Sequence, residues 1–140
     1  MTLTKLLPRL PIERTLGVIS GRWKAVIIHV LLEGPKRTCE IESQITGISQ
    51  KVLIQQLKAL EEHGIVWRKT SLEEPQRVDY SLTPLGLSLQ PLILSLQDWG
   101  QQHAQELGDS HRLISCDAVV RSLDGRRQCD SNIVVKGESS

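Results

Sequence analysis

The sequence predicts a mainly α-helical fold with one small β-hairpin. Three observations favour this class: apolar residues recur at helical spacing in several segments, glycines end those segments, and two short strand-like runs lie near mid-chain. The chain has 140 residues, which suits one domain. Hydrophobic residues make up 39% of it and Phe is absent, so we expect a core of Leu, Ile and Val.

Two helices are expected first. Pro11 suits the first turn of a helix over residues 11–20. A second, strongly apolar helix over residues 22–32 carries a stripe with helical periodicity, and Gly34-Pro35 ends it. The second segment therefore has a buried face.

A helix-turn-helix pattern follows. A short helix over residues 38–45 leads through a turn at 46–48 into a helix over 49–63, with Ser49 as its N-cap and Gly64 as its stop. Apolar residues on the second helix share one face, and polar ones share the opposite face. The inward face has Leu53, Leu57 and Leu60, whereas the outward face has Lys51, Gln55 and Lys58.

A hairpin comes directly after this pair. Runs at 65–70 and 77–82 favour strands, and the polar segment 71–76 separates them. A helix-turn-helix followed by a hairpin is the order of a winged helix, with residues 66–82 as the wing. In that architecture the second helix enters the major groove of DNA. The wing offers Arg68, Lys69 and Arg77 to phosphates, whereas Glu73 and Glu74 at its tip would be repelled by them.

The last helical segment opens at Thr83-Pro84, and Pro91 should kink or divide it. Its apolar residues alternate steps of four and three, which is typical of a helix–helix seam. The segment is either a core helix of its own domain or a dimerisation helix, and we favour dimerisation. The seam comprises Leu85, Leu89, Leu92, Leu96, Trp99 and His103, while Leu87, Ile93 and Leu94 lie off it and leave apolar surface for both uses.

Residues 108–140 differ in character, with scattered charges and few apolar patches. We expect one domain over 1–107 and a weakly ordered tail over 108–140, with a short helix near 117–123. Neither a signal peptide nor a membrane span is expected, so the predicted location is cytoplasmic. The cysteines (Cys39, Cys116 and Cys129) are too few for a disulfide scaffold, and their spacing fits no compact metal motif.

Charge nearly cancels along the whole chain. There are 17 Lys and Arg against 16 Asp and Glu, a formal net charge of +1, and residues 36–80 hold seven of each sign. This balance excludes a strongly basic or strongly acidic protein but leaves room for a local basic face. The sequence has no phosphate loop, nucleophile elbow or carboxylate pair with a partner base. We therefore expect that the protein is not an enzyme and that it binds neither a cofactor nor a metal.

Several blocks together resemble the HxlR-type winged-helix transcriptional regulators. They are PIERTL at 11–16, ISGRWK at 19–24, LEGPKR at 32–37, GISQKVL at 47–53, QQL at 55–57, RVDYSLT at 77–83 and DWG at 98–100. They stand in family order over about residues 10–103. The resemblance implies a bacterial homodimer that binds a two-fold DNA operator and joins its subunits through the first and last helices.

Carried over by position, the resemblance assigns roles to individual residues. The DNA-binding set is Ser49, Gln50, Lys51, Gln55, Gln56, Lys58, Arg37, Arg68, Lys69 and Arg77, and the dimer set is Leu16, Leu89, Leu92, Leu96 and Trp99. Several family members have a sensor cysteine where this chain has Leu10, so redox sensing does not carry over. The controlling signal and any small-molecule effector are unknown.

Two hypotheses of different classes follow. The chain is either a sequence-specific DNA-binding regulator or a winged-helix module that has lost DNA binding and binds a protein partner. The dependence of DNA affinity on salt separates them, because cation–phosphate contacts release counterions.

Overall fold

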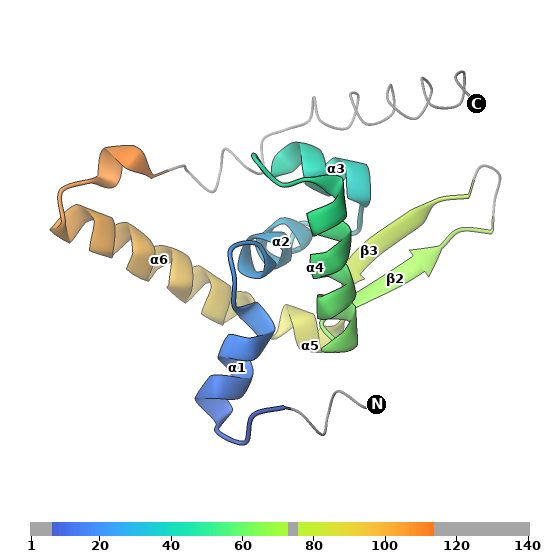
Figure 1. Ribbon diagram of the computed structural model, residues 1–140, viewed down its shortest axis with the longest axis horizontal. Helices are drawn as coiled ribbons and strands as arrows, with labels where there is room; N and C mark the ends of the chain where they lie inside the picture. Colours follow the sequence, from blue (N-terminus) through green and yellow to red (C-terminus); the bar gives the residue numbers. More distant parts are fainter. Residues whose placement is uncertain (1–6, 73–75, 114–140) are drawn as a thin grey trace.

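The computed structural model describes residues 7–72 and 76–113. Helices α1 (Pro11–Ile19), α2 (Lys24–Leu31), α3 (Thr38–Gln44) and α4 (Gln50–Glu62) form the first part, and α5 (Pro84–Leu87), α6 (Gln90–Glu106) and the 3₁₀ helix η2 (Ser110–Arg112) form the last. Strands β1 (Lys36–Arg37), β2 (Val66–Thr70) and β3 (Val78–Leu82) make one small sheet. Figure 1 shows α2 at the centre with α4 beside it, the β2–β3 hairpin projecting to one side, and α1 and α6 extending away from the hairpin. The expected fold, mainly helical with a β-wing, is confirmed.

The helix-turn-helix pair forms where the sequence predicts it. The hydroxyl of Ser49 accepts a hydrogen bond from the backbone N–H of Val52 at 3.2 Å, so α4 begins at Gln50. The turn before it needs Gly47, whose φ of 92° is disfavoured for residues with a Cβ. These two local features determine where α4 begins and how the chain turns from α3 into α4.

The sheet has the antiparallel order β1-β3-β2. The β2–β3 hairpin is the predicted wing, and next to its connecting loop the N–H of Ser71 donates to the carbonyl of Arg77 at 2.7 Å. Strand β1 is an element that the sequence analysis missed. It has two residues, and it is a strand only because Lys36 and Arg37 pair with Tyr80 and Asp79 far along the chain.

The predicted last helix is divided into α5 and α6. Thr83 caps α5, since its hydroxyl accepts from the N–H of Gly86 at 3.0 Å. Pro91 then lies in the first turn of α6, where its missing N–H costs little. Division near Pro91 is therefore confirmed.

The core is built from Leu, Ile and Val, as the composition predicts. It is centred on α2 and on the inward face of α4, and its members include Ile27, Val30, Leu53, Leu57 and Leu60, each with 0% exposure. Ile93, which lies off the predicted seam, is 4% exposed within the core, so α6 uses off-seam apolar surface to pack on its own domain.

Among the helices that the structure describes, none is long and apolar enough to cross a membrane. The helix expected near residues 117–123 and most of the expected tail lie outside the described residues, as do Cys116, Cys129 and the wing-tip residues Glu73 and Glu74.

Candidate nucleic-acid interface

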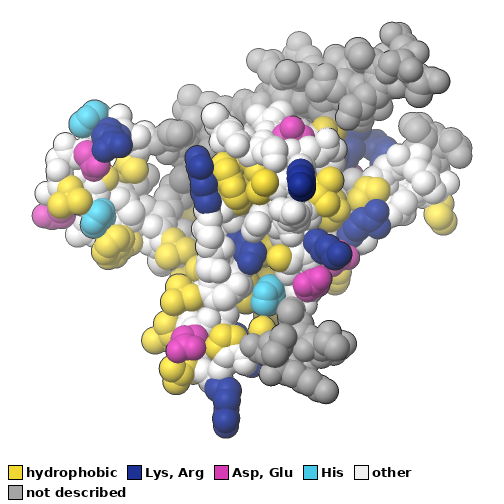
Figure 2. Space-filling model, in the orientation of Figure 1, with side chains coloured by type: hydrophobic (Ala, Val, Ile, Leu, Met, Phe, Trp, Pro, Cys, Tyr) yellow, Lys and Arg dark blue, Asp and Glu magenta, His cyan; other side chains and the backbone are white. Residues whose placement is uncertain are grey.

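The outward face of α4 is polar and open to solvent. Lys51, Gln55 and Lys58 are exposed, opposite the fully buried leucine stripe of the same helix. Gln50 is exposed at the first turn, whereas Gln56 is half-buried beside the core-facing side. Figure 2 shows dark-blue Lys and Arg side chains spaced over α4 and the strands on one side of the molecule. Five of the six residues predicted on this helix and its cap are thus exposed, and Gln56 is the exception.

The end of α4 carries a histidine in an unusual setting. His63 is half-buried, and burial followed by the positive charge of Lys24 lowers its pKa, while Glu62 acts in the opposite direction. The lowered pKa favours the neutral imidazole at this helix end.

The wing cations do not form one cluster. In the β2–β3 register Arg68 stands opposite Tyr80 and Lys69 stands opposite Asp79, so the two basic side chains lie on opposite faces of the ribbon. The ammonium of Lys69 also lies 5.5 Å from the ring centre of Trp67, two residues earlier on the same face. Strand alternation in the sequence already contained this information.

Arg37 belongs to the start of α3 more than to a DNA surface. Its backbone N–H donates to a Glu40 carboxylate oxygen at 3.0 Å, and its side-chain Nε lies 3.5 Å from the same oxygen. The side chain is 15% exposed. The structure therefore gives Arg37 a role in holding α3, in contrast to the exposed Arg68 and Arg77.

Apolar side chains are exposed on α1 and α6. Leu16 is 54% exposed, Leu96 is 43% and Trp99 is 66%, whereas Leu89 and Leu92 are partly buried against the core. Figure 2 shows hydrophobic side chains along α1 and along the facing side of α6. The sequence analysis missed Ile12, which is 76% exposed and lies one helical turn before Leu16; this i, i+4 spacing was the available signal.

A helix-turn-helix with a solvent-facing polar second helix, followed by a β-hairpin wing, defines a winged-helix DNA-binding regulator. The model of the HxlR-like helix-turn-helix family matches residues 18–107. The chain belongs to this family, as its sequence blocks indicated.

Known relatives of the chain are described as transcriptional regulators. The chain is 45% identical over 94 residues to the uncharacterized HTH-type transcriptional regulator YkvN of Bacillus subtilis, covering 67% of this chain and 80% of the relative. It is 43% identical over 98 residues to the transcriptional regulator YodB of the same organism, covering 70% and 87%. The solved structure of the redox regulator HypR in its reduced form superposes with a TM-score of 0.67 at 37% identity, covering 71% of this chain and 98% of that one. These relatives are regulators, and this chain is a regulator and not an enzyme.

Proposed function

We propose that the chain is a sequence-specific regulator that acts as a homodimer on a two-fold DNA operator. The observation that carries this proposal is the division of α4 into a fully buried leucine stripe and an exposed face with Lys51, Gln55 and Lys58. The buried leucines hold such a helix rigidly against the core, and its exposed face can enter the major groove. The DNA-binding unit with its dimer helices spans residues 1–107, and it acts in the cytoplasm.

The predicted DNA-binding residues at the start of α4 and along it have different proposed roles. The amide of Gln55 pairs with an adenine edge, and Lys51 and Lys58 donate to guanine or to phosphate, each contact contributing about 1–3 kcal/mol of discrimination when it reads a base. Ser49 and Gln50, at the start of the helix, hold a phosphate. Gln56 contributes least, because it is half-buried.

The wing, residues 66–82, lies on the flanking backbone in this proposal. Arg68 and Arg77 are its main phosphate contacts. Lys69 contributes less, because Asp79 lies opposite it on the same face of the ribbon. Arg37 serves mainly to stabilise the start of α3 through its contacts with Glu40.

The dimer forms through α1 and α6. Direct contacts come from Leu16, Leu96 and Trp99. Leu89 and Leu92 hold α6 in place by packing against the core of the same subunit. Sedimentation analysis tests this arrangement: Trp99→Asp should yield monomers. The matched control is Trp67→Asp, which changes a tryptophan that is 48% exposed on the wing and should remain dimeric. Dimers of equal strength for both variants would contradict the proposed interface.

DNA binding is tested with a duplex selected from a random-sequence library. Wild-type protein should enrich an inverted repeat and lose affinity steeply between about 50 and 200 mM salt. Lys51→Ala should weaken binding and flatten the salt dependence, whereas Arg112→Ala, at an exposed position on η2, should change neither. Affinity that is insensitive to both salt and Lys51 would instead favour a protein-interaction module.

A further inference from the structure

A cavity of about 400 Å³ lies between α2, the turn joining α3 to α4, and α6. Its walls are mostly apolar and include Trp23, Val26, Ile45, Ile93 and Leu96. A volume of this size with apolar walls is typical of small-molecule sites. One residue of the predicted seam, Leu96, lines the cavity, and no residue of the polar face of α4 does.

A polar atom with unmet hydrogen-bonding capacity borders this cavity. His29 lines it, and its Nδ1 atom is buried without a hydrogen-bond partner among the described residues. Buried polar atoms in folded proteins are nearly always paired, and an unpaired one is costly. A ligand with a hydrogen-bonding head would satisfy His29.

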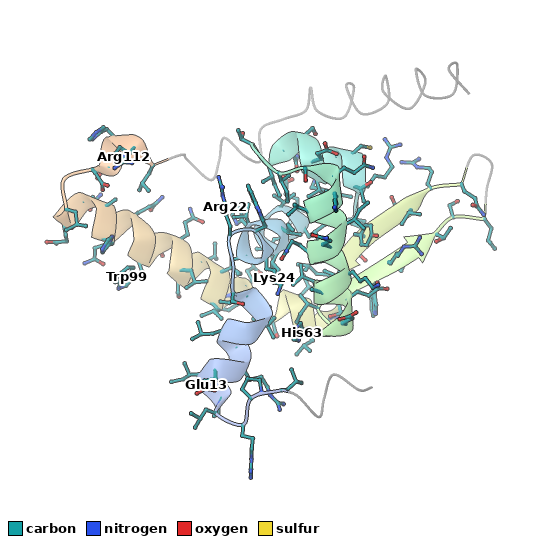
Figure 3. All side chains as sticks on the ribbon, viewed as in Figure 1. Glu13, Arg22, Lys24, His63, Trp99 and Arg112 are labelled. Atoms are coloured by element: carbon teal, nitrogen blue, oxygen red, sulfur yellow. The ribbon has the colours of Figure 1, made fainter. Side chains whose placement is uncertain are left out.

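The charges around the cavity have one sign. Arg22 lines it, with the guanidinium carbon 4.4 Å from the centre of the Trp23 ring, and no Asp or Glu belongs to the described lining. Figure 3 shows Arg22 at the start of α2, beside the space between α6 and the helix-turn-helix. The guanidinium lies over one face of the Trp23 ring, so a flat ligand with a negative group would meet the N–H donors of Arg22 and the apolar walls beside them.

The cavity also touches both functional parts of the proposed regulator. Ile45 and Thr46 belong to the turn that leads into α4, and Leu96 is itself a proposed dimer contact, one helical turn before Trp99. We propose that this cavity binds a small aromatic anion and that binding changes the affinity of the protein for DNA. The second half of this proposal rests on the proposed function.

Binding is tested without DNA by calorimetry on the full chain, with indole-3-acetate as the probe and indole-3-acetamide as its neutral counterpart. We expect saturable binding of indole-3-acetate and about tenfold weaker binding of the amide. His29→Leu and Arg22→Gln should each weaken the binding of indole-3-acetate by about tenfold. Arg22 is exposed, so its variant keeps the fold even if His29→Leu does not. Arg112→Gln, at another exposed arginine, should leave binding unchanged.

Three results would overturn the binding proposal. They are no saturable binding of either probe, equal affinity for the anion and the amide, and anion binding that survives both His29→Leu and Arg22→Gln. A further contradictory result is binding seen only in the monomeric Trp99→Asp variant, because a second copy of the chain would then fill the cavity in the dimer.

The regulatory half is tested on the selected duplex. Saturating indole-3-acetate should shift the DNA affinity of wild type by about fivefold or more, and the concentration that gives half of this shift should be about tenfold higher for Arg22→Gln. A probe that binds without shifting DNA affinity would overturn regulation while leaving the site intact. A protein that binds the probe but no DNA would contradict the proposed function and not the cavity.

Discussion

The ammonium of Lys36 lies 2.9 Å from a carboxylate oxygen of Glu33, and the two side chains differ sharply in burial. The lysine side chain is 1% exposed, whereas that of the glutamate is 37% exposed. Lys36 therefore points inward from β1 and reaches its counter-charge at the surface. It is a structural cation and not part of a DNA-binding surface.

This asymmetry predicts unequal costs for removing either partner. Glu33→Ala leaves a buried ammonium without its acceptor and should lower the free energy of unfolding by about 2–3 kcal/mol. Lys36→Met keeps the apolar stem and leaves a carboxylate that water can reach, so it should cost less than about 1 kcal/mol. Denaturant titration of both variants checks this, and equal losses would contradict the buried-charge explanation.

Gly86 predicts a steric effect on stability. A Cβ at this position would overlap the backbone carbonyl of Ile65, so Gly86→Ala should destabilise the fold by about 1–3 kcal/mol. Gly100, within α6, has nothing within 4 Å of an added Cβ. Gly100→Ala should therefore stabilise the fold by about 0.4–1 kcal/mol. Thermal and denaturant unfolding measure both changes, and a tolerated Gly86→Ala would show that α5 does not pack so closely on the strand start.

His63 predicts a pH dependence of stability. Its pKa is lowered in the folded state, chiefly by burial, so the unfolded chain binds a proton more readily. Stability from this group is thus fully present above the ordinary histidine pKa and falls as the pH drops below about 6.5. Unfolding free energies measured between pH 7.5 and about 5 should fall less steeply for His63→Gln than for wild type. Glu62→Gln should steepen the fall, because Glu62 raises the pKa; identical slopes for all three proteins would exclude this role for His63.

Local signals predicted most of the fold. Helical periodicity placed α2 and α4, Ser49 marked the start of α4, and Thr83-Pro84 marked the start of α5. Each of these depends on residues a few positions apart, which is why a single sequence reveals them.

Long-range relationships were not predictable in the same way. The two residues of β1 become a strand only through pairing with β3, and the burial of Lys36 follows from that pairing. The inward position of Ile93 depends on how α6 is rotated against α2, which its own periodicity does not determine. The opposite faces of Arg68 and Lys69 are a different case, since strand alternation alone implied them.

The central claim, that the exposed face of α4 reads DNA bases, is tested most directly through Gln55. The measurement is the affinity of Gln55→Ala for the selected duplex and for duplexes with each base pair of one half-site changed. Gln101→Ala, at an exposed position on α6, is the control. We predict that Gln55→Ala loses discrimination at one position in the half-site, by about 1–3 kcal/mol, and keeps the salt dependence of wild type. Unchanged discrimination at every position, as for Gln101→Ala, would contradict the claim.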